Sequence, residues 1–324
     1  MKNEIIIPYL SSNLPVIVEN ADEKTVFCFL EFFTAQIRNP NTRAAYRQAV
    51  VQFLRWVEEI GITELEQIHA LVVATYIEKL LREKSKPTVN QHLAAIRSLF
   101  SWLVVRGVLE ENPAATVKGP KHNVKKGSTP ILTAEETKIL LESIDDTHVV
   151  GLRDRALIAV MAYSFARISA VLNMSVGDYF ARGKRYWFRL QEKGGIQYDV
   201  PAHHKAEEYL DAYLEKARSQ ESLDFGNHTP LFRSTRGQSR LLTTRRLTRG
   251  NAYDMIQRRR IEADIMTPIG NHSFRATGIT TYLERGGTID KAQKIAAHAN
   301  IRTTQLYDRT SDAITLDEIE RIQY

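Results

Sequence analysis

Apolar residues recur at spacings of three and four through the first part of the chain, and this periodicity most constrains its fold. Residues 50–57 give one clear case, with Val, Phe, Leu and Val on one helical face. Asn39 precedes a Pro and is typical of a helix start, whereas Gly61 and Gly107 are typical of helix ends. We therefore predict a bundle of four helices within residues 23–117.

The pattern changes after this bundle, and the change predicts a second domain. Residues 118–130 hold lysines, glycines and prolines without apolar periodicity, which is typical of a basic linker. We predict that residues 131–310 form the second domain, that residues 1–22 are an N-terminal extension, and that residues 311–324 form a short tail helix. A chain of 324 residues is long enough for two domains, each with its own core.

The second domain is predicted to be mixed but mostly helical. Thr133 and Glu136 have the spacing of a capping box at its first helix. Residues 185–190 and 197–200 alternate and are rich in strand-forming types, with Lys-Gly-Gly between them. This predicts a small β-hairpin. The predicted fold class is therefore mainly α, with a helical bundle followed by a mostly helical domain that contains a small β-hairpin sheet.

The charge of the chain predicts a polyanionic partner. The net charge is +6 and the sequence pI is near 9.2, which favours nucleic acid and, more weakly, an anionic membrane surface. Cationic, hydroxyl and amide side chains cluster near two predicted helix starts, in the linker and near residue 245. They can bind DNA phosphates there, and the alternative is an ordinary solvent-exposed face. The candidate DNA-binding residues are Thr42, Arg43, Arg47, Lys86, Thr88, Asn90, Arg97, Lys121, Lys125, Lys126, Arg245 and Arg246.

Cysteine content and hydropathy indicate a cytoplasmic, nucleoid-associated protein without a membrane partner. The chain has one cysteine, Cys28, which excludes an internal disulfide and lies in an apolar run typical of a buried thiol. The N-terminal residues lack the apolar stretch of a secretory signal. The longest apolar stretch, residues 156–163, is too short to span a bilayer.

Several catalytic motifs are absent from the sequence. It contains no phosphate-binding G-x-x-x-x-G-K-[ST] loop, no H-E-x-x-H, no G-x-S-x-G and no cysteine cluster. Pairs of acids that would hold two metal ions are not evident either. ATP motors, zinc hydrolases, serine hydrolases and metal-dependent nucleases are therefore disfavoured.

The remaining candidates for chemistry are cations, histidines and one late tyrosine. His272 and Arg275 are three apart, on one face of a predicted helix. His298 precedes Tyr307 by nine residues, and Arg167 stands where one apolar helix ends and another begins. Each alone has a structural interpretation, such as a surface pair, a core histidine or an ion pair at a helix end.

Together and in this order, these residues resemble the tyrosine recombinase and phage integrase family, which includes the Xer recombinases, Cre and lambda integrase. The segments HSFRATGITTYLERGG and AAHANIRTTQLY are similar to the family's second signature box. The resemblance covers nearly the whole chain: a helical DNA-gripping domain, a basic linker and a catalytic domain. It implies a catalytic set of Arg167, Lys193, His272, Arg275, His298 and Tyr307, with Tyr307 as the nucleophile.

The first signature box departs from the family pattern at two positions. The family usually has an acidic residue three positions after its first arginine, where this chain has Ala170. Asp178 is one residue that could brace the active site instead. The family also commonly has Gly two positions before that arginine, where this chain has Phe165.

The residue types suit phosphoryl transfer without a cofactor. A phenol with a pKa of about 10 gives an oxyanion more readily than an aliphatic hydroxyl does. Two arginines offer bidentate donors to the charge that develops on phosphate oxygens. Lys193 would protonate the leaving 5′-oxygen, His272 would accept or relay the phenolic proton, and His298 would donate to a phosphate oxygen. We expect no metal and no nucleotide cofactor, because a phosphotyrosine link conserves the energy of the broken bond.

Three functions fit these features. The first is a site-specific recombinase that acts through a 3′-phosphotyrosine on double-stranded DNA with paired recognition sites, as a homo-oligomer, with a tetramer on DNA expected. The second is a type IB topoisomerase-like nicking and closing enzyme, and the third is a catalytically inactive DNA-binding relative. The linker, the helical first domain and the tail favour the first function. In the resembled family such a tail docks on a neighbouring protomer, and docking on its own protomer is the alternative.

Overall fold

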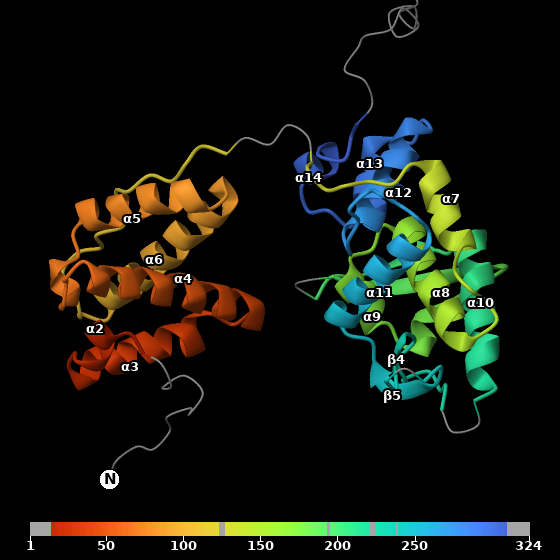
Figure 1. Ribbon diagram of the computed structural model, residues 1–324, viewed down its shortest axis with the longest axis horizontal. Helices are drawn as coiled ribbons and strands as arrows, with labels where there is room; N and C mark the ends of the chain where they lie inside the picture. Colours follow the sequence, from red (N-terminus) through yellow and green to blue (C-terminus); the bar gives the residue numbers. More distant parts are fainter. Residues whose placement is uncertain (1–13, 123–126, 193–194, 221–223, 238, 310–324) are drawn as a thin grey trace, which may run out of the picture. The chain divides into compact units, whose positions relative to one another are not determined.

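The computed structural model describes residues 14–122, 127–192, 195–220, 224–237 and 239–309. The chain divides into two compact units, Met1–Asn123 and Val124–Tyr324, each with a hydrophobic core of its own (Figure 1). The boundary between the units falls within the predicted linker. Across the described ranges, no helix is both long enough and apolar enough to cross a membrane.

The first unit is helical, which confirms that prediction. At its centre the Phe53 ring lies 5.0 Å from the Tyr76 ring and 6.1 Å from the Phe100 ring, between ring centroids. All three side chains are buried, and burial of each contributes about 2 kcal/mol. Ile17 and Val18, in the predicted extension, are also buried in this core. The elements are α2 (Val16–Glu19), α3 (Glu23–Glu31), the π-helical turn η1 (Phe32–Gln36), α4 (Pro40–Glu59), the 3₁₀ turn η2 (Leu65–Gln67), α5 (Ala70–Glu83) and α6 (Lys86–Val105).

The predicted start of α4 and the predicted ends of α4 and α6 are confirmed. The Asn39 side chain accepts hydrogen bonds from the backbone N–H groups of Asn41 and Thr42, at 3.0 and 3.2 Å. These contacts satisfy donors that a helix leaves unpaired at its first turn. Gly61 and Gly107 follow the two helices with φ of 85° and 64°, left-handed values that favour glycine.

The second unit is built around α8 (Val149–Ser164), most of whose residues are buried. Helix α10 (His204–Arg218) and helix α12 (Ser273–Glu284) pack against α8 (Figure 1). The predicted capping box is present, because Thr133 and Glu136 exchange side-chain to backbone hydrogen bonds at the start of α7. The remaining helices are α7 (Ala134–Glu142), α9 (Ile168–Asn173), the 3₁₀ turn η3 (Val176–Asp178), α11 (Arg249–Glu262), α13 (Ile289–Ile295) and α14 (Ile301–Gln305).

Two small antiparallel sheets complete the second unit. The predicted hairpin is confirmed as β2 (Arg185–Gln191) and β3 (Gln197–Pro201), and it pairs with a further strand, β1 (Tyr179–Arg182). A second sheet joins β4 (Arg233–Thr235) to β5 (Leu242–Arg246). The sequence analysis missed β1, β4 and β5. Each of these strands is short, and β5 ends in two arginines that suggest a basic surface more strongly than a strand.

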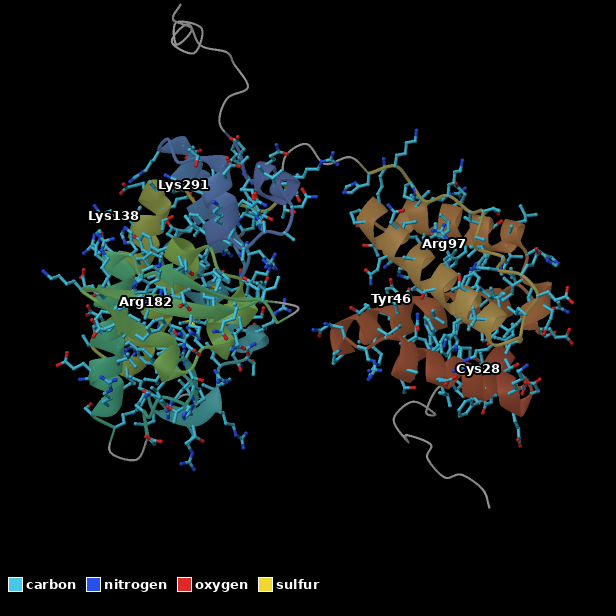
Figure 2. The ribbon with its side chains drawn as sticks, turned by 180° about the vertical axis from the view of Figure 1, so that it is seen from behind. Cys28, Tyr46, Arg97, Lys138, Arg182 and Lys291 are labelled. Carbon is cyan, nitrogen blue, oxygen red and sulfur yellow. The ribbon has the colours of Figure 1, made fainter. Side chains whose placement is uncertain are left out.

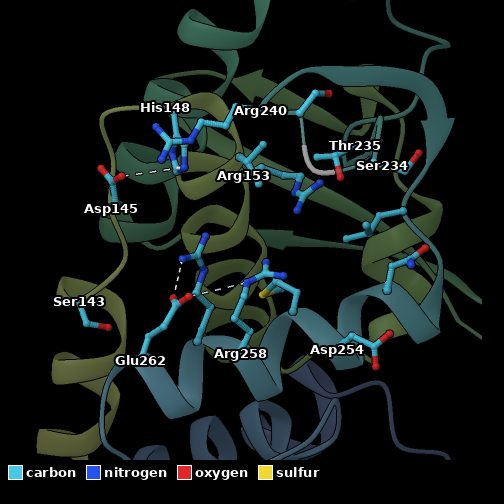
Figure 3. A pocket seen from close by; sticks show the side chains of 17 residues that line it. Ser143, Asp145, His148, Arg153, Ser234, Thr235, Arg240, Asp254, Arg258 and Glu262 are labelled. Carbon is cyan, nitrogen blue, oxygen red and sulfur yellow. Dashed lines mark hydrogen bonds and ion pairs between the residues drawn. The ribbon is translucent and has the colours of Figure 1, made fainter.

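A polar cavity of about 700 Å³ is lined by residues from α8, α11 and the β4–β5 hairpin (Figure 3). Arg153 and Arg259, which line the cavity, both pair with the buried carboxylate of Asp154, at 2.6 Å from Arg153 Nη2 and 2.8 Å from Arg259 Nη2. The Asp154 side chain is 0% exposed, and the two guanidinium groups compensate its charge, as a buried ion requires. The five candidate catalytic residues that the structure describes, Arg167, His272, Arg275, His298 and Tyr307, do not line this cavity.

Candidate active site

Arg167 stands at a break between two helices, as the sequence predicts. Helix α8 ends at Ser164, Phe165 takes a left-handed conformation with φ of 55°, and Arg167 is the N-cap residue of α9. The break turns the chain sharply, so that the arginine leaves the buried core with a side chain one-third exposed. A polar ligand can therefore reach its guanidinium.

Arg275 is more deeply buried than Arg167. It lies in the first turn of α12, with a side chain only 2% exposed. Its guanidinium donates to the carbonyl of Phe165 and, at 2.7 Å, to the carbonyl of Ala296. Burial and then the charge of Arg167 lower the pKa of Arg275. The side chain thus ties the end of α8 to the segment before His298.

A carboxylate that the sequence analysis missed lies between the two arginines. Glu192 Oε2 is 2.5 Å from Arg167 Nη1, and Glu192 Oε1 is 3.6 Å from Arg275 Nη1. Its side chain is 2% exposed. A buried carboxylate needs cationic partners to offset its lost hydration, and here it has two. Glu192 therefore fixes the spacing of the arginines.

The hypothesis that Asp178 takes the place of the acid missing at Ala170 is wrong. Asp178 Oδ2 accepts the backbone N–H of Ser175 at 2.8 Å and belongs to the cap of η3. The carboxylate paired with Arg167 is that of Glu192.

Glu192 also closes the hairpin that carries Lys193. Its backbone N–H donates to the carbonyl of Ile196 at 2.8 Å, and its carbonyl accepts the N–H of Gly195 at 3.2 Å. Gly195 has φ of 80°, a value that the tight turn requires. Lys193 itself lies outside the described residues.

His272 precedes α12 on an exposed side of the cluster. Partial desolvation, followed by the charges of Arg249, Arg275 and Arg167, lowers the pKa of His272. The ring is therefore neutral at physiological pH and can accept a proton. Arg249, at the start of α11, adds a further positive charge near this ring.

His298 and Tyr307 lie with their rings parallel. The ring centroids are 5.8 Å apart and the planes differ by 5°. His298 Nδ1 is 2.9 Å from Thr304 Oγ1, and burial, then Arg275 and Arg167, lower the pKa of His298 to about 3. If Thr304 donates to Nδ1, the single proton of the neutral ring is on Nε2, free to donate to a ligand.

The backbone of Tyr307 is held by α12. Tyr307 follows α14 and is half-buried, and its carbonyl accepts the hydroxyl of Thr280 at 2.9 Å. Burial and the charge of Arg167 lower the pKa of Arg275, and the electrostatic interactions with Glu192 and then with Tyr307 act in the opposite direction. The phenol and the buried arginine therefore belong to one electrostatic cluster.

Sequence comparisons identify the family of the chain. The pattern of the phage integrase family matches residues 130–313, more than half of the chain, and that of the phage integrase N-terminal SAM-like domain matches residues 29–107. The chain belongs to the phage integrase family. It is similar to tyrosine recombinase XerC of Thermodesulfovibrio yellowstonii (28% identical over 273 residues, 82% of this chain and 85% of the relative). It is also similar to tyrosine recombinase XerD of Mycobacterium leprae (28% identical over 286 residues, 82% of this chain and 86% of the relative). The chain is accordingly an enzyme of the tyrosine recombinase class.

Solved structures of recombinases share the fold. The XerH site-specific recombinase has a TM-score of 0.66 and 19% identity, with 91% of this chain and 87% of that chain covered. A lambda integrase has a TM-score of 0.64 and 16% identity, with 88% of this chain and 96% of that chain covered.

One signal in the recombinase sequence points to Glu192. In β2 the burial alternates, and Phe188 and Leu190 face the core. The same period of two places Glu192 inward, one residue before the turn. A carboxylate at an inward strand position next to a predicted catalytic lysine therefore predicts a buried partner for cations.

Two predicted DNA-contact side chains on α6 bind the recombinase's own backbone. Arg97 is labelled in Figure 2. It donates from Nε to the carbonyl of Ala114 at 3.2 Å and from Nη2 to that of Val117 at 2.6 Å. Asn90 Nδ2 donates to the carbonyl of Pro120 at 3.1 Å. These side chains hold the segment that leads into the linker.

Arg43 and Arg246 also serve the fold. Arg43 donates from Nε and Nη2 to the carbonyl of Ile37, at 3.1 and 2.9 Å. Arg246 Nη1 donates to the carbonyls of Leu172 and Met174, at 3.1 and 2.6 Å, and so satisfies the end of α9.

The other predicted contacts differ in their surroundings. Thr42 and Thr88 lie in the first turns of α4 and α6, and Arg47 is half-buried on α4. Lys86, Lys121 and Arg245 are exposed. Lys125 and Lys126 lie outside the described residues.

Proposed function

We propose that this recombinase cuts and rejoins double-stranded DNA at specific sites through a covalent 3′-phosphotyrosine at Tyr307. The observation that carries the proposal is the convergence of Arg167, Arg275, His298 and Tyr307 in one cluster ordered by Glu192. Two cations and one carboxylate leave a net charge of +1, which matches the single charge of a phosphodiester.

In the proposed cleavage step, the phenolic oxygen of Tyr307 forms a bond to phosphorus and the bond from phosphorus to the 5′-oxygen breaks. His272, neutral because its pKa is lowered by partial desolvation and then by Arg249, takes the phenolic proton. Lys193 gives a proton to the leaving 5′-oxygen. Arg167 and Arg275 donate to the non-bridging oxygens, where preorganised donors contribute roughly 3 kcal/mol each.

Rejoining is the same step in reverse. A 5′-hydroxyl attacks the phosphotyrosine, Tyr307 leaves and regains a proton, and the phosphodiester forms again. The energy of the original bond is conserved throughout, so the proposed reaction needs no nucleotide. Exchange between two DNA sites follows when the attacking hydroxyl comes from another strand.

We further propose that the active form is a tetramer on paired sites. Among the structural neighbours, XerH is bound to a difH substrate, and a lambda integrase tetramer is bound to a Holliday junction. These complexes support the proposal by analogy of fold. The predicted tail helix, residues 311–324, lies outside the described residues.

The test uses duplex DNA carrying the protein's own site, with a nick that traps the cleaved strand. Wild-type protein should give an adduct that survives denaturation, and Tyr307→Phe should bind the same DNA without forming one. An adduct with Tyr307→Phe would identify another nucleophile and overturn the proposal. Joining of two labelled duplexes, as opposed to relaxation of a supercoiled plasmid alone, separates recombination from topoisomerase-like activity.

A further inference from the structure

The chain that enters the second unit is bound to the segment that carries Tyr307. Residues 127–129, here named the strap, lie beside residues 306–309, more than 170 residues later in the sequence. The backbone N–H of Gly127 donates to the carbonyl of Leu306 at 2.7 Å. Arg309 Nη2 donates to the carbonyls of Gly127 and Thr129, at 3.2 and 2.5 Å.

These contacts fall on both sides of the tyrosine. Leu306 precedes Tyr307 directly and Arg309 follows it by two residues, so the strap holds the short stretch at two points. Thr280 of α12 holds the same stretch from a third direction through the carbonyl of Tyr307, at 2.9 Å. Within the stretch, the N–H groups of Tyr307 and Asp308 donate to the carbonyls of Thr304 and Gln305, at 2.9 and 3.1 Å, and so extend the five-residue helix α14. The strap adds contacts from outside this short helix, which is marginal alone.

The fit at Gly127 is too close for a side chain. A Cβ atom at this position would lie 2.8 Å from the carbonyl oxygen of Leu306, the same oxygen that accepts the Gly127 N–H. The backbone of the strap and that of the tyrosine segment therefore approach each other only because residue 127 is glycine.

We propose that the strap is a positioning element for Tyr307 and that it makes cleavage depend on the linker. This rests on the proposed function, in which Tyr307 is the nucleophile. The strap falls in the last part of the predicted linker, residues 118–130. A change in the linker therefore reaches the backbone on either side of Tyr307 through the three strap contacts.

The experiment compares full-length variants on the nicked site used for Tyr307→Phe. Gly127→Ala disturbs the close approach, Arg309→Gln removes the charged double donor, and Arg309→Lys restores a cation with donors. Ser128→Ala is the matched control, because Ser128 is exposed and its side chain makes none of the three strap contacts. Binding, unfolding temperature and the rate of adduct formation at saturating DNA are measured for each.

Gly127→Ala and Arg309→Gln should form the adduct about tenfold more slowly, with half-site binding and unfolding temperature close to wild type. Arg309→Lys should be intermediate and Ser128→Ala unchanged. If wild type forms the Tyr307 adduct and both Gly127→Ala and Arg309→Gln form it at the wild-type rate, the strap proposal is wrong and the proposed function stands. The strap proposal is also wrong if the rates of these two variants fall only in proportion to their losses of binding or unfolding temperature. If wild type forms no adduct at Tyr307, the proposed function fails and the strap proposal fails with it.

Discussion

Glu192 Oε2 lies 2.5 Å from Arg167 Nη1, and the pair stands where a DNA phosphate is expected to enter. In the proposed reaction, a phosphate oxygen competes with this carboxylate for the Arg167 guanidinium, so we expect the strength of the pair to influence both affinity and rate. Because the Glu192 side chain is buried while Arg167 is one-third exposed, the arginine is the partner that can turn toward a ligand.

Glu192→Gln should therefore separate binding from cleavage. The amide keeps the volume and one acceptor but raises the charge of the site by one, so DNA should bind as well as or better than to wild type. Cleavage should fall about tenfold, because the two guanidinium groups lose the charge that fixes their spacing. Rates of adduct formation and half-site affinities check this, and Asp178→Asn, which changes an acid in the η3 cap, should leave both at wild-type levels.

Glu192→Ala should be worse for the fold than Glu192→Gln. Both substitutions remove the negative charge beside Arg275, but alanine also removes the acceptor oxygen and most of a buried side chain, at a cost of about 3 kcal/mol relative to wild type. Urea unfolding of wild type and the two variants gives the comparison. A Glu192→Gln variant as stable as wild type would show that the carboxylate charge contributes no ion-pair energy, and an alanine variant as stable as the glutamine variant would contradict the expected order.

His298 should make stability depend on pH in an identifiable window. Burial, then Arg275 and Arg167, lower the pKa of the folded ring to about 3, whereas an unfolded histidine titrates near 6.5. The unfolded state therefore binds a proton between these values and the folded state does not. This contribution is complete above pH 6.5 and is lost as the pH falls, by up to about 1.4 kcal/mol per unit.

His298→Trp gives the control for this effect, because an indole keeps an N–H donor and does not titrate. The free energy of unfolding is measured from pH 7 to pH 4.5 for both proteins. The wild-type curve should fall more steeply than that of the variant, and parallel curves would contradict a neutral buried His298.

The sequence predicts most of the architecture for physical reasons that are local. Helix starts and ends follow from capping at Asn39 and from left-handed backbone at Gly61 and Gly107. The β2–β3 hairpin follows from alternation and a glycine turn. The strands β1, β4 and β5 could not be predicted with the same ease, because short pairings depend on neighbours that are distant in sequence.

The candidate site was predicted less completely than the fold. The order of arginines, histidines and tyrosine along the chain indicates the cluster, but the pairing of Glu192 with Arg167 joins residues 25 apart in sequence. The contacts of Arg97 and Arg246 likewise join residues that are distant in sequence. Their charge suggests phosphate contacts, whereas their donors are occupied by backbone carbonyls that only the folded chain brings near.

Phe165 tests how much strain the site stores. Its φ of 55° costs a non-glycine residue roughly 1 kcal/mol, while its ring is buried and lies 5.9 Å from that of Tyr282. Phe165→Gly relieves the strain but loses a buried aromatic side chain worth about 3 kcal/mol, so it should destabilise by about 2 kcal/mol. Phe165→Ala loses the ring and keeps the strain, and should be about 1 kcal/mol less stable than Phe165→Gly. Urea unfolding at one pH ranks the three proteins, and an alanine variant as stable as the glycine variant would show that the backbone is not held in this conformation.

Arg245 and Arg246 offer an adjacent pair in which surface charge and fold support can be separated. Arg245 is exposed, whereas Arg246 donates to the carbonyls of Leu172 and Met174 and, at 2.9 Å, to Ser175 Oγ. If Arg245 contacts a phosphate as predicted, Arg245→Ala should weaken binding to all DNA sequences and reduce the salt slope by about one, with unchanged unfolding temperature. Arg246→Ala should instead lower the free energy of unfolding by about 2 kcal/mol, because it leaves carbonyls at the end of α9 without their donors.

Replacing each arginine by lysine sharpens the comparison. A lysine retains the charge that sets the salt slope but lacks the planar guanidinium with which Arg246 binds three acceptors. Arg245→Lys should therefore restore binding, while Arg246→Lys should restore little of the stability. Salt titrations of DNA binding and urea unfolding of the four variants test the two roles. A loss of stability in Arg245→Ala, together with a changed salt slope in Arg246→Ala, would reverse them.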